Sequence, residues 1–239
     1  MKKTILSTVT PLRILSVLTT ALIGVLFSSA AQAGMIGPII PYYGIAQSPF
    51  NGLPFTYFHL ETFEEAGAPT APGVTASAGV VYTGALGDSV EGPGPLGHSF
   101  FSGCGSCGIT FTFNAAALGG HLPTNVGIVW TDGDAPNRTF KAYDASNALI
   151  GTIIDSTQKF YSTGGDNLPS NYRFFGATNP AGISSIFIAN TSGGIEVDDL
   201  QYGYLAPAVP EPGEWALMLS GLGLMGFIAA RSQKTTKAA

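Results

Sequence analysis

This chain of 239 residues has acidic side chains near both ends of its predicted globular part. Glu61 and Glu64 flank the first aromatic, alternating stretch, and Glu196, Asp198 and Asp199 lie in the last one. If the first and last strands of a sandwich are neighbours, these groups converge, and their hard oxygens suit calcium, which takes six to eight such ligands. One hypothesis is therefore a calcium site formed by Glu61, Glu64, Asp198 and Asp199. The competing interpretation, which the pattern favours somewhat more, is that Glu196 and Asp198 form the solvent-facing side of a strand.

The two cysteines, Cys104 and Cys107, lie in the glycine-rich sequence FSGCGSCGI. A redox C-x-x-C centre needs a helix N-terminus to lower the thiol pKa, whereas a strand-like run follows here. A zinc site needs further ligands at a suitable spacing, which the histidines His59, His98 and His121 do not provide. The favoured interpretation is a disulfide between Cys104 and Cys107 that closes a short loop after export.

Motifs of hydrolytic and phosphate chemistry are missing from the sequence, which has no G-x-S-x-G, H-E-x-x-H or phosphate-binding loop. We predict that the protein has no catalytic residues. The alternative is a glycoside-acting hydrolase that uses two carboxylates across a groove.

Several aromatic residues of predicted strands offer rings for stacking on sugars, although strand aromatics more often belong to a core. They are Trp130, Tyr143, Tyr161, Tyr172 and Phe174.

Charge excludes one class of partner. Between residues 34 and 209, four Lys and Arg minus thirteen Asp and Glu give a formal balance of −9. Such a body cannot neutralise phosphates, which argues against nucleic acid as a partner. The chain also contains 32 glycines and 16 prolines, and together with short β-branched and aromatic runs they favour an all-β domain with many turns.

Short segments of strand-like composition follow one another at regular intervals. They predict an antiparallel β-sandwich, jelly-roll-like, over residues 56–205. Residues 34–55 form a Pro/Gly-rich irregular arm that we expect to lie on the body, because it carries many large apolar side chains. Residues 114–120 have helical propensity, but paired glycines end it within about two turns. The predicted strands are 56–63, 77–84, 109–113, 126–131, 138–144, 149–155, 172–178, 183–190 and 194–203.

The first 33 residues have the three zones of a secretory signal peptide. A basic start is followed by an uncharged apolar run over 14–27 and by the A-x-A pattern of Ala31 and Ala33. We predict export and cleavage by signal peptidase after Ala33.

A second apolar segment lies at the other end of the chain. A linker over 206–213 contains Pro-Glu-Pro, and residues 214–231 are predicted to form one transmembrane helix, followed by a basic cytoplasmic tail over 232–239. The uncharged stretch from Trp215 to Ala230 has 16 residues, or about 24 Å of helix, which is short against a hydrocarbon core of about 30 Å.

The string Val209-Pro210-Glu211-Pro212, the Gly-rich apolar segment and the basic cluster led by Arg231 together resemble the PEP-CTERM sorting signal of Gram-negative bacteria, over about residues 208–233. The resemblance implies that exosortase is a partner, with Pro210, Glu211, Pro212 and Arg231 as recognition residues. It also implies passage through the inner membrane to the cell surface or the extracellular matrix. A structural or polysaccharide-interacting role there is the expected function.

Overall fold

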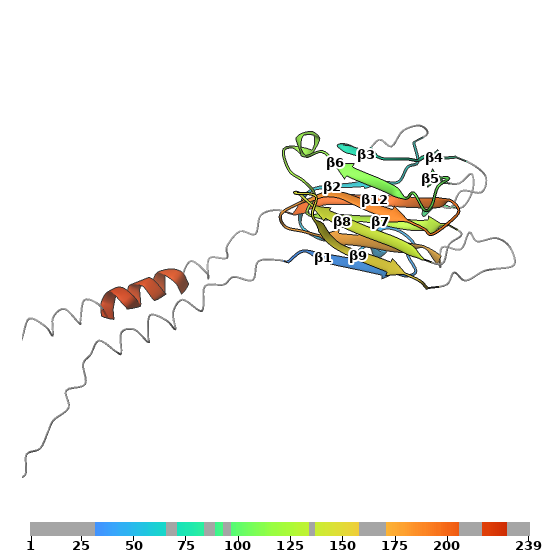
Figure 1. Cartoon of the computed structure of the whole chain (residues 1–239). Coiled ribbons are helices and arrows are strands. Elements are labelled where there is room, and N and C mark those ends of the chain that lie inside the picture. The colour runs from blue at the N-terminus through green and yellow to red at the C-terminus, as the bar shows by residue number, and fades with distance from the viewer. Residues whose placement is uncertain are drawn as a thin grey trace, which may run out of the picture.

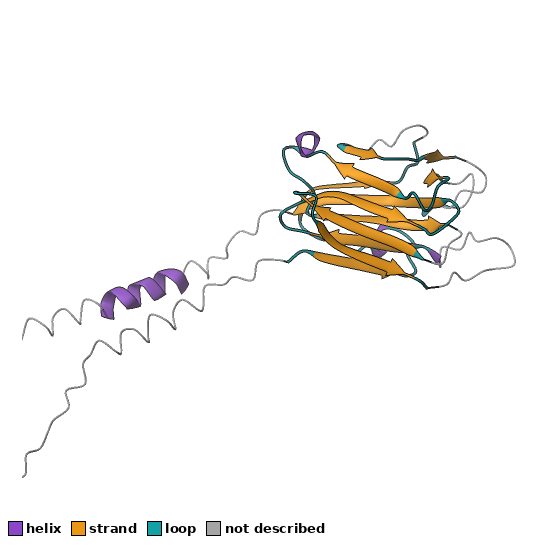
Figure 2. Cartoon of the chain, viewed as in Figure 1, coloured by secondary structure: helices purple, strands orange, loops and turns teal. Residues whose placement is uncertain are grey.

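Two antiparallel β-sheets pack face to face in the computed structural model of the chain (Figure 1). The structure describes residues 32–65, 71–83, 89–92, 97–133, 137–157, 171–205 and 217–228. Most of the regular structure in these segments is strand, and the longest helix covers residues 217–228 (Figure 2). The predicted antiparallel β-sandwich is therefore confirmed.

The larger sheet has seven strands in the order β1-β10-β7-β12-β5-β4, and β2 also pairs with β12. β12 is 11 residues long, and its first part pairs with β5 while its second part pairs with β2. The last strand thus lies beside the first strand of the predicted sandwich. The strands of this sheet are β1 (Gly34–Ile39), β2 (Phe55–Glu61), β4 (Val80–Tyr82), β5 (Ser99–Ser102), β7 (Asn125–Asp132), β10 (Arg173–Thr178) and β12 (Ile195–Leu205).

The smaller sheet has five strands in the order β3-β6-β11-β8-β9. In β6, Ile109, Phe111 and Phe113 are buried between the sheets while Thr112 is exposed, which is the alternation expected of a strand with one face on a core. β8 and β9 form the predicted hairpin. The strands are β3 (Val74–Ala76), β6 (Ile109–Phe113), β8 (Arg138–Asp144), β9 (Leu149–Asp155) and β11 (Ile183–Ala189).

The N-terminal arm covers the outer face of the larger sheet. Residues 34–55 were expected to be irregular, but they include β1, which pairs with β10, and the 3-10 helix η1 (Ile45–Gln47). Tyr42 and Phe50 from the arm pack on Val129 and Phe174 in a second apolar cluster. β7 is consequently buried on both faces, and the arm is part of the folded body.

The segment with helical propensity forms only the single turn η3 (Ala115–Leu118). The Asn114 side chain accepts a hydrogen bond from the Ala116 N–H at its start, and Gly119 ends it at φ 72°. Because a left-handed residue cannot continue the helix, the chain turns away there.

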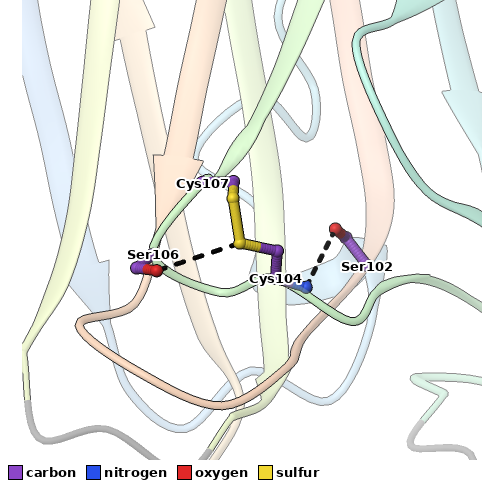
Figure 3. The surroundings of a disulfide bond; sticks show 4 residues. All are labelled: Ser102, Cys104, Ser106 and Cys107. Carbon is purple, nitrogen blue, oxygen red and sulfur yellow. Dashed lines mark hydrogen bonds between the residues drawn. A yellow bond between two sulfur atoms is a disulfide. The ribbon is translucent and has the colours of Figure 1, made fainter.

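The loop between β5 and β6 contains the predicted disulfide (Figure 3). Cys104 and Cys107 are joined across a Cα–Cα distance of 5.3 Å. Between them, Gly105 exchanges backbone hydrogen bonds with Asn190 and Gly193 of the turn that precedes β12. The closed loop therefore holds this turn beside the end of β5.

Candidate functional site

A break in the regular pattern of β12 places two consecutive carboxylates on the same face of the sheet. The register of β12 against β7 shifts between Asp198 and Gln201, and Asp199 has a φ of 45°. Val197 and Leu200 on either side both belong to the core between the sheets. At such a bulge, one extra residue interrupts the alternation, so two consecutive side chains can lie on the same face of the sheet. Asp198 and Asp199 therefore both face away from the main core.

Glu91 completes a cluster of three carboxylates. One oxygen each of Glu91, Asp198 and Asp199 lies within 4.8 Å of the others. Asp198 and Asp199 are 0% and 1% exposed, while Glu91 lies at the surface. The Val90 N–H donates to Asp198 Oδ2 over 2.8 Å and fixes the segment 89–92 against β12.

The N-terminal arm reaches the same cluster through a chain of buried hydrogen bonds. The Tyr42 hydroxyl donates to Asp199 Oδ2 over 3.1 Å and accepts from Gln201 Nε2 over 2.7 Å. Ser48 in turn donates to Gln201 Oε1. Asp199 Oδ1 is buried without a hydrogen-bond partner. The cluster therefore connects β12, the segment 89–92 and the arm.

Burial and mutual repulsion perturb the acids of this cluster. Burial, then the charges of Glu91 and Asp199, hold the pKa of Asp198 well above its usual range. Burial and the charge of Glu91 raise the pKa of Asp199 to about 7. Burial, reinforced by Asp199, raises the pKa of Tyr42. A nearby positive charge would stabilise the ionised forms of these acids. Carboxylate oxygens are also the ligands that hard divalent cations prefer.

The structure brings together only part of the predicted calcium site. Asp198 and Asp199 are in the cluster, but Glu61 and Glu64 lie outside it. Glu61 Oε1 turns back to accept from the Phe63 N–H at the end of β2. Glu64 Oε1 accepts from the Ser89 hydroxyl and the His98 N–H.

The third carboxylate of the cluster belongs to Glu91 and not to Glu61 or Glu64. The sequence analysis did not identify Glu91. It lies in a Gly/Pro-rich stretch without strand periodicity, so no local signal points to it. Ser89, whose hydroxyl contacts both Glu64 and Glu91, connects the predicted acid to the observed one.

Three of the rings considered for sugar stacking are buried, in line with the more usual place of strand aromatics in a core. Trp130 and Phe174 are 0% exposed and Tyr172 is 1% exposed. They lie on or beside the central strands β7 and β10, which the arm and the second sheet cover. Tyr143 is partly exposed, and Tyr161 lies outside the described residues.

Other aromatic rings line a cavity of about 630 Å³ at one end of the sandwich. Tyr204, near the end of β12, stacks on Tyr57 with centroids 5.5 Å apart and contacts the His121 ring at 5.1 Å. Among the described residues, none that line the cavity is Asp, Glu, Lys or Arg. The lining residues are Thr56, Ala115, Gly120, His121, Leu122, Thr124, Pro180, Ala181, Gly182, Tyr204 and Leu205.

A further group of buried charges lies between β8, β9 and β10. Asp155 Oδ2 is 2.9 Å from Arg138 Nε and 2.9 Å from Arg173 Nε. Both guanidinium groups lie over the Trp130 ring, at 4.6 and 5.3 Å from its centroid. Burial opposes ionisation of Asp155, but hydrogen bonds from Thr157 and the charge of Arg138 outweigh it and lower the pKa. These groups are enclosed and serve the packing of the body.

The C-terminal segment contains an exposed apolar helix over residues 217–228. No helix in the described part of the chain is both long enough and apolar enough to cross a membrane. The predicted recognition residues Pro210, Glu211, Pro212 and Arg231 lie outside the described residues, as does Ala31 of the predicted cleavage site. Ala33 is described and exposed, directly before β1.

The described part of the chain is an antiparallel β-sandwich, which is followed in the sequence by a short apolar helix. Residues 208–234 match the family model of the PEP-CTERM protein-sorting motif. The chain therefore carries this sorting motif, as the sequence predicted. The motif indicates export and sorting to the cell surface, and it implies exosortase as a partner.

Comparison with other proteins gives only distant similarities. No curated protein matches the chain. The K1 cleaved adhesin domain of Lys-gingipain from Porphyromonas gingivalis W83 aligns with a TM-score of 0.41 at 14% identity, over 63% of this chain and 99% of that domain. The C-terminal family 22 carbohydrate-binding module of Clostridium thermocellum Xyn10B aligns with a TM-score of 0.35 at 14% identity, over 66% and 99%. Similarities at this level carry no argument about the ligand of this chain.

Proposed function

We propose that this chain is a surface-sorted protein whose β-sandwich binds a neutral polysaccharide without cleaving it. The observation that carries the proposal is the cavity beside Tyr204, which combines aromatic rings with hydroxyl groups and has no Asp, Glu, Lys or Arg among its described lining residues. Rings pack on the apolar faces of sugars, while hydroxyl and backbone groups exchange hydrogen bonds with sugar hydroxyls.

The placement of the carboxylates supports a non-catalytic role. Glycoside hydrolases hold two carboxyl groups about 5–10 Å apart on either side of an accessible sugar. In the cluster described above, Asp198 and Asp199 are buried and therefore cannot flank an accessible sugar. The described lining of the cavity contains no carboxylate.

Sugar binding is tested by affinity electrophoresis of the purified protein through gels that contain neutral or anionic polysaccharides. We expect neutral polysaccharides to retard the wild type, and Tyr204→Ala to abolish the retardation. Tyr43→Ala is the matched control, because Tyr43 is 54% exposed and does not line the cavity. Equal retardation of Tyr204→Ala and wild type would contradict the proposed site. Release of new reducing ends from the bound polysaccharide would contradict the non-catalytic role.

Sorting is tested in the native host by mass spectrometry of the mature C-terminus. We expect the wild type to end near residues 210–213 and the variant Pro210→Ala/Pro212→Ala to keep its tail. Pro207→Ala, outside the matched motif, serves as the control and should be processed like the wild type. A wild-type protein that still ends at Ala239 would show that the tail is retained.

A further inference from the structure

We propose that Glu91, Asp198 and Asp199 bind a calcium ion that holds the N-terminal arm and the segment 89–92 against the last strand. Two independent observations support the site. Glu91 and the consecutive pair Asp198 and Asp199, from two distant parts of the chain, converge with one oxygen each within 4.8 Å of the others. In addition, Asp199, only 1% exposed, has an oxygen, Oδ1, without a hydrogen-bond partner.

The unpartnered oxygen calls for a positively charged neighbour. A buried carboxylate oxygen without a donor loses its hydration and gains nothing in return. The carboxylate of Glu91, in the same cluster, is also an acceptor and cannot serve Asp199 unless one of the two takes a proton. A cation would satisfy both acids at once.

The spacing and chemistry of the ligands fit calcium. Ligands at about 2.3–2.6 Å from one ion can lie up to about 5 Å apart, so one calcium ion can contact oxygens that all lie within 4.8 Å of one another. Magnesium demands a near-ideal octahedron at about 2.0–2.1 Å, whereas calcium tolerates the irregular geometry of ligands from separate segments. The exposed side chain of Glu91 provides an approach from solvent, where water can complete the coordination.

Each ligand is bonded to an element that the ion would therefore hold in place. The Val90 N–H donates to Asp198 Oδ2, so the segment 89–92 depends on the position of that carboxylate. The Tyr42 hydroxyl donates to Asp199 Oδ2, and its ring stacks on Phe174 with centroids 5.7 Å apart. Without the ion, the carboxylates would repel one another. This repulsion would weaken the hydrogen bonds that Val90 and Tyr42 donate to them.

The test is a titration of the full chain, purified in detergent and stripped with a chelator, with calcium chloride. At about a hundred times the dissociation constant, calcium should raise the melting temperature by about 5–10 °C. Glu91→Gln, at an exposed position that does not endanger folding, and Asp199→Asn should each bind calcium at least tenfold more weakly. Asp144→Asn, which removes a partly exposed carboxylate at the end of β8, should bind like the wild type.

Hydrogen exchange supplies a second readout. Amides of residues 42–50 and 89–92 should exchange more slowly with calcium than with chelator, while amides of the buried strand β6 should not change. The proposal is overturned if calcium leaves the melting temperature unchanged, if magnesium acts equally well, or if Glu91→Gln and Asp199→Asn bind calcium like the wild type.

Discussion

Replacing Asp155 by asparagine would remove a negative charge from a place where two positive charges are enclosed. Arg138 and Arg173 are each 1% exposed, and the Nε atoms of both lie 2.9 Å from Asp155 Oδ2, to which Arg138 donates a hydrogen bond. The loss of one partner leaves charge in a medium that solvates it poorly. Burial and the charge of Arg138 already lower the pKa of Arg173 to about 10, even with Asp155 in place.

The expected loss follows from the depth of the site. Breaking a buried ion pair by removing one partner costs about 3–5 kcal/mol. Asparagine keeps an oxygen that can still accept from the Thr157 N–H and hydroxyl, as Asp155 Oδ1 does. We therefore expect the lower end, about 3 kcal/mol, which corresponds to a melting temperature lower by about 6–12 °C for a domain of this size.

Asp144→Asn provides a matched control. Asp144 ends β8 as Asp155 ends β9, and it accepts in the same way from the N–H and hydroxyl of the residue two positions later, Ser146. Asp144 is partly exposed, whereas Asp155 is buried, so the replacement of Asp144 should change stability little. Urea unfolding of the two variants and the wild type measures the difference. Similar free energies of unfolding for Asp155→Asn and Asp144→Asn would refute the reasoning.

The same contacts predict how acid affects the protein. The pKa of Asp155 lies below the 3.8 of an unperturbed aspartate, so the unfolded chain takes up this proton first as the pH falls. The stabilisation by Asp155 is therefore complete above pH 3.8 and is lost as the pH falls through the lower pKa of the folded state. The free energy of unfolding should fall more steeply below pH 4 in the wild type than in Asp155→Asn, and parallel curves would contradict this assignment.

Two further predictions concern packing and the disulfide. Gly203→Ala should cost about 1–3 kcal/mol, because an added Cβ would lie 2.4 Å from the Tyr57 carbonyl oxygen of the paired strand. Gly103→Ala, where the nearest atom is 4.0 Å away, is the control, and equal melting temperatures of the two variants would contradict the close approach. The double variant Cys104→Ser/Cys107→Ser should lose no more than about 2 kcal/mol, because the bond closes a loop of sequence separation 3. A loss of twice that size in urea unfolding would mean that the bond does more than close this loop.

Local patterns predicted the strands whose residues alternate. β6 and β8 have the bounds expected from the sequence, since one face of each packs on the core and the residues alternate accordingly. β9 also has the expected bounds, because the turn after β8 predicted it as the second strand of a hairpin. β5 was missed because Ser-Phe-Phe-Ser does not alternate. Ser99 is buried there against Glu196, a partner 97 residues away. The predicted strand 77–84 begins later than expected, after Gly79, where φ is 110°. Among its described residues 77–83, only Val80–Tyr82 form a strand.

The candidate cation site was predicted in part for a similar reason. Asp198 and Asp199 were identified because they lie together in the last strand. Alternation alone would separate them, and only the bulge at Asp199 places both on one face. Glu91 could not be found, because its place in the cluster depends on how the segment 89–92 packs across β12.

The sequence alone determined the sorting motif and the all-β class, since a linear signal is recognised as a short peptide and alternation is a property of neighbouring residues. Tertiary structure decided which side chains became accessible. The arm folds over β7 and β10, which buries Phe174 and Tyr172 and leaves Tyr204 beside the cavity. The burial of a side chain and the convergence of carboxylates both depend on contacts between segments that are distant in the sequence. The spacing of residues within one segment therefore cannot predict them.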